Sequence, residues 1–535
     1  MPTPVTGASG IPRRRRSLRR ASAVSAIVAS GALVLSGCAA SGDGGDAAKD
    51  VVNVVTPAQP STLDPQISTE SIMGEITGSI YETLVVTDEN LVPQPMLAES
   101  FERSDDGLEY TFVLREGVKF HDGSELTASD VVDSMNRWTR VSIAADGAFD
   151  GSEWTEVDDY TVKLTVPTAS FLHLLYLSDI GTSYPAIMPS EVIEEFGDEP
   201  VQDIVGTGPY TLKEWDADQR IVIEKWDDYQ SVDAPSSGRA GAKDAVLNEV
   251  VFSFVPDAAT RTMGMQSGQY DVTPELPFDG LTQFQEDPNL VLGTYTIGPI
   301  NLVYSDRAGG PFENVVNRQA VNTALDRDPI MLASVGSEEL YDLVHHNMTE
   351  PQQAIWDTEV GKAEFNSADT AAAKALLAEG GYAGEPVTLL VTRDYTEAYN
   401  AAVVVAEQLK GIGVDVKLEA LEWASYFDKY KEGRDEWDLT IIPQGTVTDP
   451  TQTVGFLPNR AGYYDTPELH DLLARFRAAP TQDDATLIFD EMQQYIETYR
   501  PLTRLGDAHN VYAASKDLEL PVFNSHFVWW NASWK

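Results

Sequence analysis

The alternation of apolar and polar residues predicts short strands over the first half of the chain. Alternating stretches cover Tyr110–Leu114, Tyr160–Val166 and Arg220–Lys225. Such period-two patterns are typical of strands with one buried face. A β-branched run at residues 51–55 suggests where ordered structure begins, and Ser129–Trp138 has the spacing of a short helix. We therefore expect strands, turns and a few helices up to about residue 256.

Between residues 369 and 442 the pattern changes to alternating helices and strands. Alanine-rich and leucine-rich segments predict helices at Thr370–Glu379 and Ala401–Lys410, and glycines follow both. Glycine at this position suits a left-handed C-terminal cap. The apolar segments between and after them predict strands at Val387–Val391, Val414–Leu418 and Trp437–Ile442. Strand–helix–strand order at this spacing implies a right-handed crossover and a largely parallel sheet, so the fold class is α/β.

The N-terminus has the organisation of an export signal. Six arginines between Arg13 and Arg20 precede an uncharged run, Ala21–Leu35, and the sequence Leu-Ser-Gly-Cys ends at Cys38. This run is shorter than the ~20 residues that a spanning helix needs, so we interpret residues 1–37 as a secretory signal. The ending resembles a bacterial lipobox, which implies that Cys38 becomes the lipidated first residue of the mature protein. Residues 38–50 are small and polar, as in a flexible tether.

Composition narrows the class of protein. The 535 residues carry a formal net charge of −47, which makes nucleic-acid binding improbable. A hydrophobic content of 42% with ten tryptophans favours packed cores over disorder. The length suits two or three domains. After the signal, no segment approaches 18 uncharged apolar residues, so we expect the remainder to be soluble and held at the outer face of the cytoplasmic membrane by its lipid alone.

The sequence contains no recognisable catalytic motif. It has no GxSxG elbow, no HExxH helix and no GxxxxGK[ST] loop, and its one cysteine is Cys38. The histidines are scattered apart from His345 and His346, which we expect to lie in a surface loop. Adjacent histidines point in different directions and seldom bind one ion together, so we expect no metal site. Because catalytic motifs are missing as well, we expect no cofactor and no enzymatic activity.

Five motifs resemble those of a known family. They are PQPMLAESF at Pro93–Phe101, LEYTFVLREGVKFHD at Leu108–Asp122, GSELTASDVVDSMNRW at Gly123–Trp138, GTGPY at Gly206–Tyr210 and NRQAVNTALDRDPI at Asn317–Ile330. In this order they resemble the solute-binding proteins of family 5, the dipeptide, oligopeptide and nickel receptors of ABC importers. The resemblance covers residues 51–535. Within it, Asn317–Asp328 is expected to form one amphipathic helix.

The resemblance implies a two-lobed periplasmic-binding-protein-like fold of type II, in the large family 5 form with an extra subdomain, mixed sheets and a hinge. Lobe I would comprise residues 51–256 with the inserted subdomain, lobe II residues 257–503, and residues 504–535 would return to lobe I. The crossings are expected near Phe254–Asp257 and Arg504–His509. The protein would close around a solute as a monomer and deliver it to a membrane permease.

The resemblance also implies a set of ligand-binding residues in four segments. They are Gln59, Ser61, Leu63, Asn301, Tyr304, Trp423, Tyr426, Gln444, Thr446 and Asp449. Trp423 matches an aromatic position that lines the side-chain pocket of oligopeptide receptors. An indole at that position supplies a large rigid apolar face with one hydrogen-bond donor.

The ligand class stays open because one position departs from the family pattern. Peptide receptors carry an aspartate for the peptide ammonium where this chain has Thr446. A threonine hydroxyl cannot replace a buried counter-ion, although Asp449 could do so if the loop shifts. Arg393 is a candidate for a ligand carboxylate, or a surface residue. The alternatives are a peptide-like solute, an oligosaccharide stacked on Trp423, and a nickel chelate. A lipid-anchored hydrolase or cell-wall protein would be a different class.

Overall fold

The computed structural model describes residues 49–181, 183–276, 281–305, 307–349, 352–432, 434–457 and 462–535. The expected signal, Cys38 and most of the tether lie outside the described residues. Residues 48–535 form one compact unit. Its strands are β1 Val51–Thr56, β2 Val85–Thr87, β3 Pro93–Pro95, β4 Ala98–Arg103, β5 Glu109–Leu114, β6 Glu153–Asp158, β7 Thr161–Thr165, β8 Tyr210–Asp216, β9 Arg220–Lys225, β10 Glu249–Phe254, β11 Val272–Thr273, β12 Leu290–Tyr304, β13 Tyr341–Asp342, β14 Val387–Thr392, β15 Val416–Leu421, β16 Leu439–Pro443, β17 Leu502–Ser515, β18 Leu518–Glu519, β19 Val522–Phe523, β20 His526–Phe527 and β21 Ser533–Trp534.

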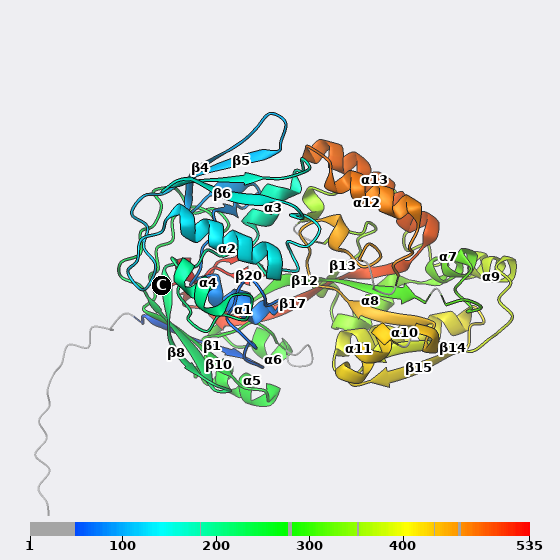
Figure 1. Cartoon of the computed structure of the whole chain (residues 1–535). Helices are drawn as coiled ribbons and strands as arrows, with labels where there is room; N and C mark the ends of the chain where they lie inside the picture. The colour runs from blue at the N-terminus through cyan, green and yellow to red at the C-terminus, as the bar shows by residue number, and fades with distance from the viewer. Residues whose placement is uncertain are drawn as a thin grey trace, which may run out of the picture. The chain divides into compact units, whose positions relative to one another are not determined.

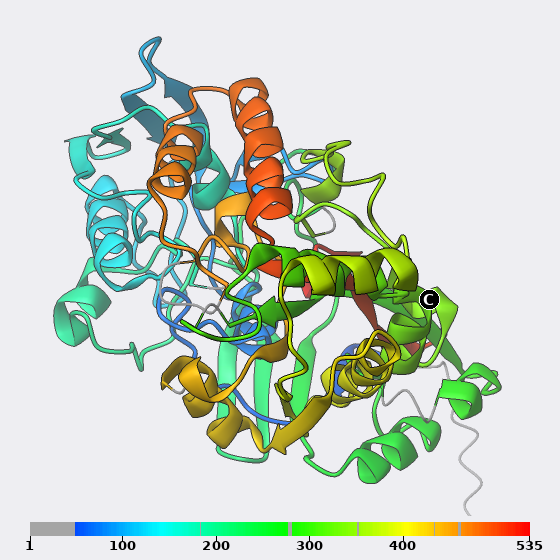
Figure 2. The same cartoon turned by 90° about the vertical axis from the view of Figure 1, so that its right-hand side faces the viewer.

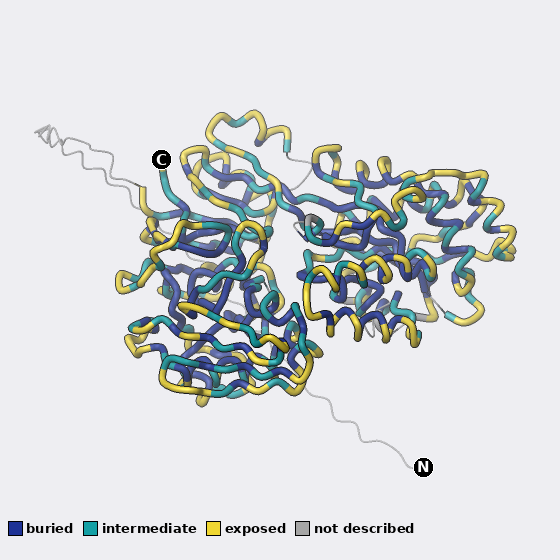
Figure 3. The backbone as a smooth tube through the Cα atoms, turned by 90° about the horizontal axis from the view of Figure 1, so that it is seen from above, coloured by how far each residue is buried: buried dark blue, intermediate teal, exposed yellow. Residues whose placement is uncertain are grey.

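Along the sequence, the helices alternate with these strands or with groups of them. They are α1 Ser71–Thr77, α2 Ala128–Val141, α3 Leu172–Ser178, α4 Ser190–Phe196, α5 Ala258–Gln266, α6 Leu281–Gln285, α7 Val315–Ala324, α8 Arg327–Val335, α9 Thr370–Glu379, α10 Thr396–Gly411, α11 Trp423–Glu432, α12 Pro467–Arg477 and α13 Gln482–Tyr499. In the burial trace of Figure 3, buried segments and exposed turns alternate along the chain, as expected for elements that each bury one face.

One large sheet organises the described residues. Its strand order is β15-β14-β16-β12-β17-β11-β1-β10-β9-β8, and β13 pairs with β17. We call β11, β1, β10, β9 and β8 the first half of this sheet, and β16, β14 and β15 its second half. The strand β1 is parallel to β10 and β11, and β14 is parallel to β15 and β16. Both halves therefore contain parallel pairs, joined by two long strands between them.

The strands β12 and β17 connect the two halves of the sheet. They pair antiparallel from Leu290↔Ser515 to Val303↔Leu502, and the pairing is irregular between Thr296 and Gly298 and between Ile300 and Asn301. The end of β12 pairs with β16, whereas β11 pairs with the end of β17. Figure 1 shows both strands passing through the centre of the unit. The segment 258–273 still belongs to the first half of the sheet, because it contains β11. The chain reaches the second half only along β12, whose end pairs with β16.

A smaller antiparallel sheet, in the order β4-β5-β7-β6, forms a separate layer. It shares one apolar core with α2, α3 and α12–α13, although those last helices are more than 300 residues away in sequence. Within that core, Phe171 lies 5.8 Å from both Trp356 and Phe476, measured between ring centroids. Figures 1 and 2 both show the orange helices α12 and α13 beside this blue and cyan layer. Helices from the C-terminal part of the chain therefore complete the apolar core of a layer formed by its N-terminal part.

The secondary structure confirms most of the sequence pattern. The helix at Thr370–Glu379 has the expected bounds, with Gly381 in the left-handed region at φ +75°, and the predicted parallel pairing of β14 is present. The structure also explains why the turn at Gly206–Tyr210 begins with glycine. A Cβ on Gly206 would lie 2.1 Å from the carbonyl oxygen of Ile80, so only glycine fits this close approach.

Two predictions are wrong. The expected single helix Asn317–Asp328 is two helices, α7 and α8, because Leu325 adopts an extended conformation with ψ 125°. Pro329 in the first turn of α8 would clash with the carbonyl of residue 325 in a continuous helix. The expected surface pair at residues 345–346 is also absent, because His346 is 4% exposed.

Candidate functional site

The loop that leaves β16 makes direct contacts with helix α3. The carboxylate of Asp449 is fully buried and accepts hydrogen bonds from the Tyr176 hydroxyl and, at 2.7 Å, from the backbone N–H of Thr451. Next to it, the Thr448 hydroxyl donates to Asp179 Oδ2 at 2.6 Å. Burial raises the pKa of the Asp449 carboxyl and holds the pKa of Tyr176 well above its ordinary value. Both Asp449 oxygens thus already accept hydrogen bonds from the protein.

The other two predicted residues of this loop differ in role. Gln444 fixes the loop, because its side-chain oxygen accepts from the Val454 N–H at 2.9 Å and its backbone N–H donates to Pro299 O at 2.9 Å. The approach is close at Gly298, where a Cβ would lie 2.1 Å from the Gln444 carbonyl oxygen. Thr446 is half-buried between these anchors. Of the predicted residues in this loop, Thr446 is therefore the one that is partly exposed and whose side chain makes none of the hydrogen bonds described above.

The predicted residues on β12 are both fully buried, but on opposite faces of the strand. Tyr304 packs in the core of the second half, and its hydroxyl is 2.7 Å from Thr503 Oγ1. Asn301 pairs across the sheet with Arg504 and Ile442. Among the described residues, neither polar atom of the Asn301 amide has a hydrogen-bond partner. Tyr304 thus supports the fold, whereas Asn301 keeps unused donor and acceptor capacity.

The predicted residues after β1 lie at the first half of the sheet. Leu63 is completely buried in its core. Ser61 is exposed and donates to Glu70 Oε2 at 2.6 Å, and the Gln59 side chain bonds the backbone N–H of Asp218 at 2.9 Å. These contacts hold the segment against its own half of the sheet.

Helix α11 carries a row of aromatic rings that ends at the surface. Trp423 is 38% exposed and stacks on Tyr426 with ring centroids 5.5 Å apart. Tyr426 is buried, with its hydroxyl 3.0 Å from Thr440 Oγ1. The ring of Tyr395, itself 41% exposed, stands perpendicular to the Trp423 indole at 4.9 Å. Trp423 and Tyr395 therefore form an accessible aromatic surface, whereas Tyr426 supports it from below.

Sequence reasoning missed Tyr176 and Asp179, which the fold brings to the loop at residues 444–450. Neither belongs to a motif, and about 270 residues separate them from Asp449, so only a family alignment could have given a signal. Arg393, the candidate for a ligand carboxylate, is exposed.

Neither a metal-binding cluster nor a membrane-spanning helix is present among the described residues. No group of three or more histidine, cysteine or acidic side chains is arranged to hold a metal ion in the part of the chain that the structure describes. In the same part, no helix is both long and apolar enough to cross a membrane.

Comparison with known proteins gives consistent matches. The model of the bacterial extracellular solute-binding proteins, family 5, matches residues 92–466. The chain is 27% identical over 485 residues to a probable peptide ABC transporter periplasmic-binding protein of Sinorhizobium fredii, covering 86% of this chain and 88% of the relative. It is 26% identical to the oligopeptide-binding protein AppA of Bacillus subtilis, covering 91% and 93%. The solved structure of AgaA from A. tumefaciens with agropinic acid superposes with a TM-score of 0.72 at 25% identity, covering 91% and 99%.

Proposed function

Because the chain belongs to the bacterial extracellular solute-binding proteins of family 5, a family of transporter components and not of enzymes, we propose that its solute is a peptide or a peptide-like molecule. The protein is the substrate-binding component of an ABC importer and works with the permease of that importer. The observation that carries the proposal is the match over about nine-tenths of the chain to relatives named for peptides. The fold class is the two-lobed α/β fold of this family.

The geometry around residues 444–450 supports a peptide whose amine is not held by a carboxylate. The carboxylate of Asp449 is engaged by Tyr176 and Thr451, and Thr446 offers only a hydroxyl. A ligand ammonium buried there without a counter-ion would be costly. Peptides with a blocked or internal amine therefore suit this loop, with a side chain placed on the Trp423 surface.

A titration of matched peptides tests the proposal. Isothermal titration of the full chain with free and N-acetylated forms of the same peptides should give dissociation constants within about threefold of each other, because no carboxylate favours the ammonium. In Thr446→Asp, the free form should gain about tenfold. Thr446→Asn is the control, because asparagine has about the size and shape of aspartate but carries no charge. If no peptide in either form binds the wild-type chain, the peptide proposal fails.

An oligosaccharide is the second candidate, favoured by the exposed pair of Trp423 and Tyr395. Sugar rings present C–H faces that pack on indoles, so Trp423→Ala should abolish binding of such a ligand. A thermal-shift screen with peptides, oligosaccharides and nickel chelates separates the three classes. A ligand at a hundredfold over its Kd stabilises the bound protein by about 2.7 kcal/mol.

We also propose the domain organisation that the sequence predicts. Lobe I would comprise residues 51–256 and 504–535, lobe II residues 257–503, and closure would bend β12 and β17 at their irregular pairs. Hinge closure of a monomer predicts a smaller radius of gyration with ligand, at an unchanged molar mass, in small-angle X-ray and light scattering. A mass that doubles with ligand would contradict it.

The N-terminal pattern supports a lipid anchor at Cys38. Mass spectrometry of the mature N-terminus should find a diacylated cysteine at residue 38, and the protein should fractionate with membranes. In Cys38→Ser the lipid and the membrane association should both be lost. A mature chain that begins elsewhere with an unmodified residue would overturn the anchor, and leave the solute-binding function untouched.

A further inference from the structure

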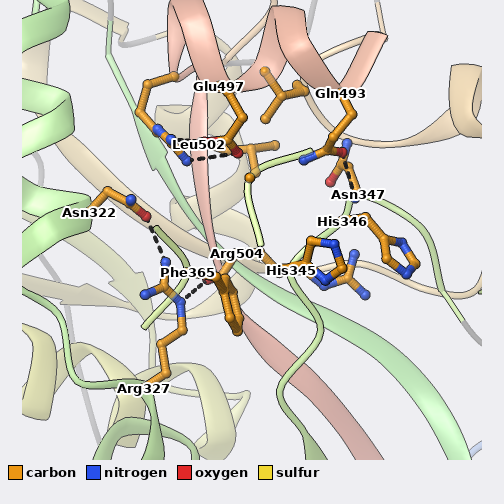
Figure 4. A pocket seen from close by; sticks show the side chains of 13 residues that line it. Asn322, Arg327, His345, His346, Asn347, Phe365, Gln493, Glu497, Leu502 and Arg504 are labelled. Atoms are coloured by element: carbon orange, nitrogen blue, oxygen red, sulfur yellow. Dashed lines mark hydrogen bonds and ion pairs between the residues drawn. The ribbon is translucent and has the colours of Figure 1, made fainter. Parts of the chain in front are cut away.

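A small cavity lies beneath the junction of α8, α13 and β17, away from the aromatic surface of Trp423. Its volume is about 20 Å³, enough for a single water-sized occupant. Three arginines line it, each at most 8% exposed: Arg327 at the start of α8, Arg500 after α13, and Arg504 in β17. Figure 4 shows Arg327 on one side of the cavity and Arg504 beside the two adjacent histidines on the other.

The positive charge around this cavity exceeds the negative charge. Arg500 forms an ion pair with Glu497, and Arg504 forms one with Asp507. Arg327 instead donates only to neutral acceptors, namely the Arg504 carbonyl oxygen at 2.8 Å and Asn322 Oδ1 at 2.6 Å. Among the described residues, Arg327 has no carboxylate partner. One buried guanidinium is thus uncompensated, an arrangement that is costly in free energy.

The unused hydrogen-bonding groups around the cavity are almost all donors. No described partner exists for Arg327 Nη1, Arg500 Nε, or Nε and Nη1 of Arg504. His346 Nδ1 is also unpartnered. Burial, with the neighbouring Arg504 charge as a second cause, lowers the pKa of His346 to about 3, so the ring is neutral. The cavity therefore lacks acceptors rather than donors.

A water molecule satisfies such a site poorly. Water brings two donors of its own, which would have to share acceptors with other donors, because Glu497 Oε1, Asn322 Oδ1 and Gln493 Oε1 each already accept one hydrogen bond. An anion brings only acceptor capacity and cancels the surplus charge. We propose that this cavity is a binding site for one small monovalent anion of about the size of chloride, held by Arg327, Arg500 and Arg504. This site is independent of the solute-binding function proposed above.

Thermal unfolding of the full chain in different sodium salts tests the site. At equal ionic strength, sodium chloride or bromide should raise the melting temperature above its value in sodium gluconate, whose anion is too large to enter, by about 2 °C or more. Equal ionic strength keeps the screening of the highly acidic surface the same in all salts. Equal melting temperatures in the three salts would overturn the proposal.

A pair of variants separates the site from general salt effects. In Arg327→Met, the surplus charge disappears and the halide-dependent shift should be lost. Arg261→Met is the matched control, because Arg261 is also buried and donates to the carbonyl oxygens of Val255 and Pro256. This control should keep the full halide shift. A halide shift of unchanged size in Arg327→Met would count against the site.

Crystallography of the wild-type chain keeps the proposal testable should the variant fail to fold. Crystals soaked in sodium bromide should show an anomalous difference peak within hydrogen-bond distance of Arg327 Nη1 and Arg504 Nη1. Bromide peaks at surface positions only, with a water or nothing in the cavity, would refute the site.

Discussion

Arg137 and Arg327 are equally buried, at 0% and 1% exposed, yet their surroundings differ completely. Arg137 donates to both carboxylate oxygens of Asp64, to Gln66 Oε1 at 2.9 Å, and to the carbonyl oxygens of Gly197 and Glu199. Every nitrogen of its guanidinium has an acceptor. Arg327 has two neutral acceptors and one unused nitrogen.

The hydrogen-bond partners of the two arginines distinguish a buried charge that stabilises the fold from one that could bind a ligand. A buried ion pair with all its hydrogen bonds made is self-sufficient, and it fixes the conformation of the segments it joins. Arg137 does this for the segments at residues 64–66 and 197–201. A buried cation without such partners implies either a cost that the fold tolerates or an occupant that supplies the missing charge. Removing the carboxylate from Arg137, or adding one beside Arg327, should convert one situation into the other.

The largest effect is expected from Asp64→Asn. The change keeps the shape of the side chain but leaves the Arg137 charge buried without a counter-ion, which should reduce the free energy of unfolding by about 3–5 kcal/mol. Urea denaturation measures the loss. Asp198→Asn is the control, because its partner Arg140 and Asp198 are both more than half exposed. An exposed pair of this kind contributes at most about 1 kcal/mol. Equal losses in the two variants would contradict the comparison.

The next effect concerns pH and His346. Its folded-state pKa is about 3, below the ordinary 6.5, so its contribution to stability is complete above pH 6.5 and is lost as pH falls toward 3. The free energy of unfolding should therefore fall by up to about 1.4 kcal/mol per pH unit in this window, relative to His346→Gln. A bound anion would favour the imidazolium, so chloride should reduce this slope.

His173 provides the internal control for that experiment. Burial lowers its pKa to about 4, but it lies against Tyr110 and Phe149, outside the arginine-lined cavity. The pH dependence that His173→Gln removes should be the same in chloride and in gluconate. If chloride changes both slopes equally, its effect is not local to the cavity.

How much the sequence predicts depends on the range of the interactions. The helix at Thr370–Glu379 and the parallel strand β14 follow from local periodicity and from the glycines after the helix, so they were predicted correctly. The break between α7 and α8 had a local signal as well. Pro329 cannot lie inside a continuous helix but fits the first turn of a new one, where its missing N–H has no role.

The sites made by distant segments had no such signal. His346 was expected in a surface loop together with His345, but it is buried beside Phe489 of α13, a helix more than 130 residues later. Likewise Tyr176 meets Asp449 only because α3 and the loop after β16 pack together. Motif similarity suggested Gln444, Thr446 and Asp449 as neighbours. It could not indicate which of their polar atoms the fold already uses.

Adding a carboxylate to the second environment should make it resemble the first. Asn322→Asp places a negative charge on the acceptor that Arg327 Nη2 contacts at 2.6 Å. In gluconate this variant should be more stable than the wild-type chain by about 1–2 kcal/mol, since a charge-assisted hydrogen bond replaces a neutral one. It should also lose its response to chloride. Asn317→Asp, which removes the amide donor to the Pro311 carbonyl oxygen and adds no arginine contact, should instead be destabilising.

An effect of similar size is expected at Asp449, a fully buried carboxylate whose hydrogen-bond donors, like the acceptors of Arg327, are neutral. Tyr176→Phe removes one of them and should lower the free energy of unfolding by about 1–2 kcal/mol at pH 8. Burial raises the pKa of Asp449, so the stability that its protonation contributes is present below its ordinary pKa of 3.8 and lost as pH rises. Because the tyrosine hydroxyl favours the charged form, the penalty of Tyr176→Phe should be larger at pH 8 than at pH 4.

Tyr160→Phe, which loses a bond to the exposed Glu125, should change stability by less than about 0.5 kcal/mol. A Tyr176→Phe penalty that does not grow with pH would show that Asp449 stays protonated in the folded protein, and that no uncompensated carboxylate exists there.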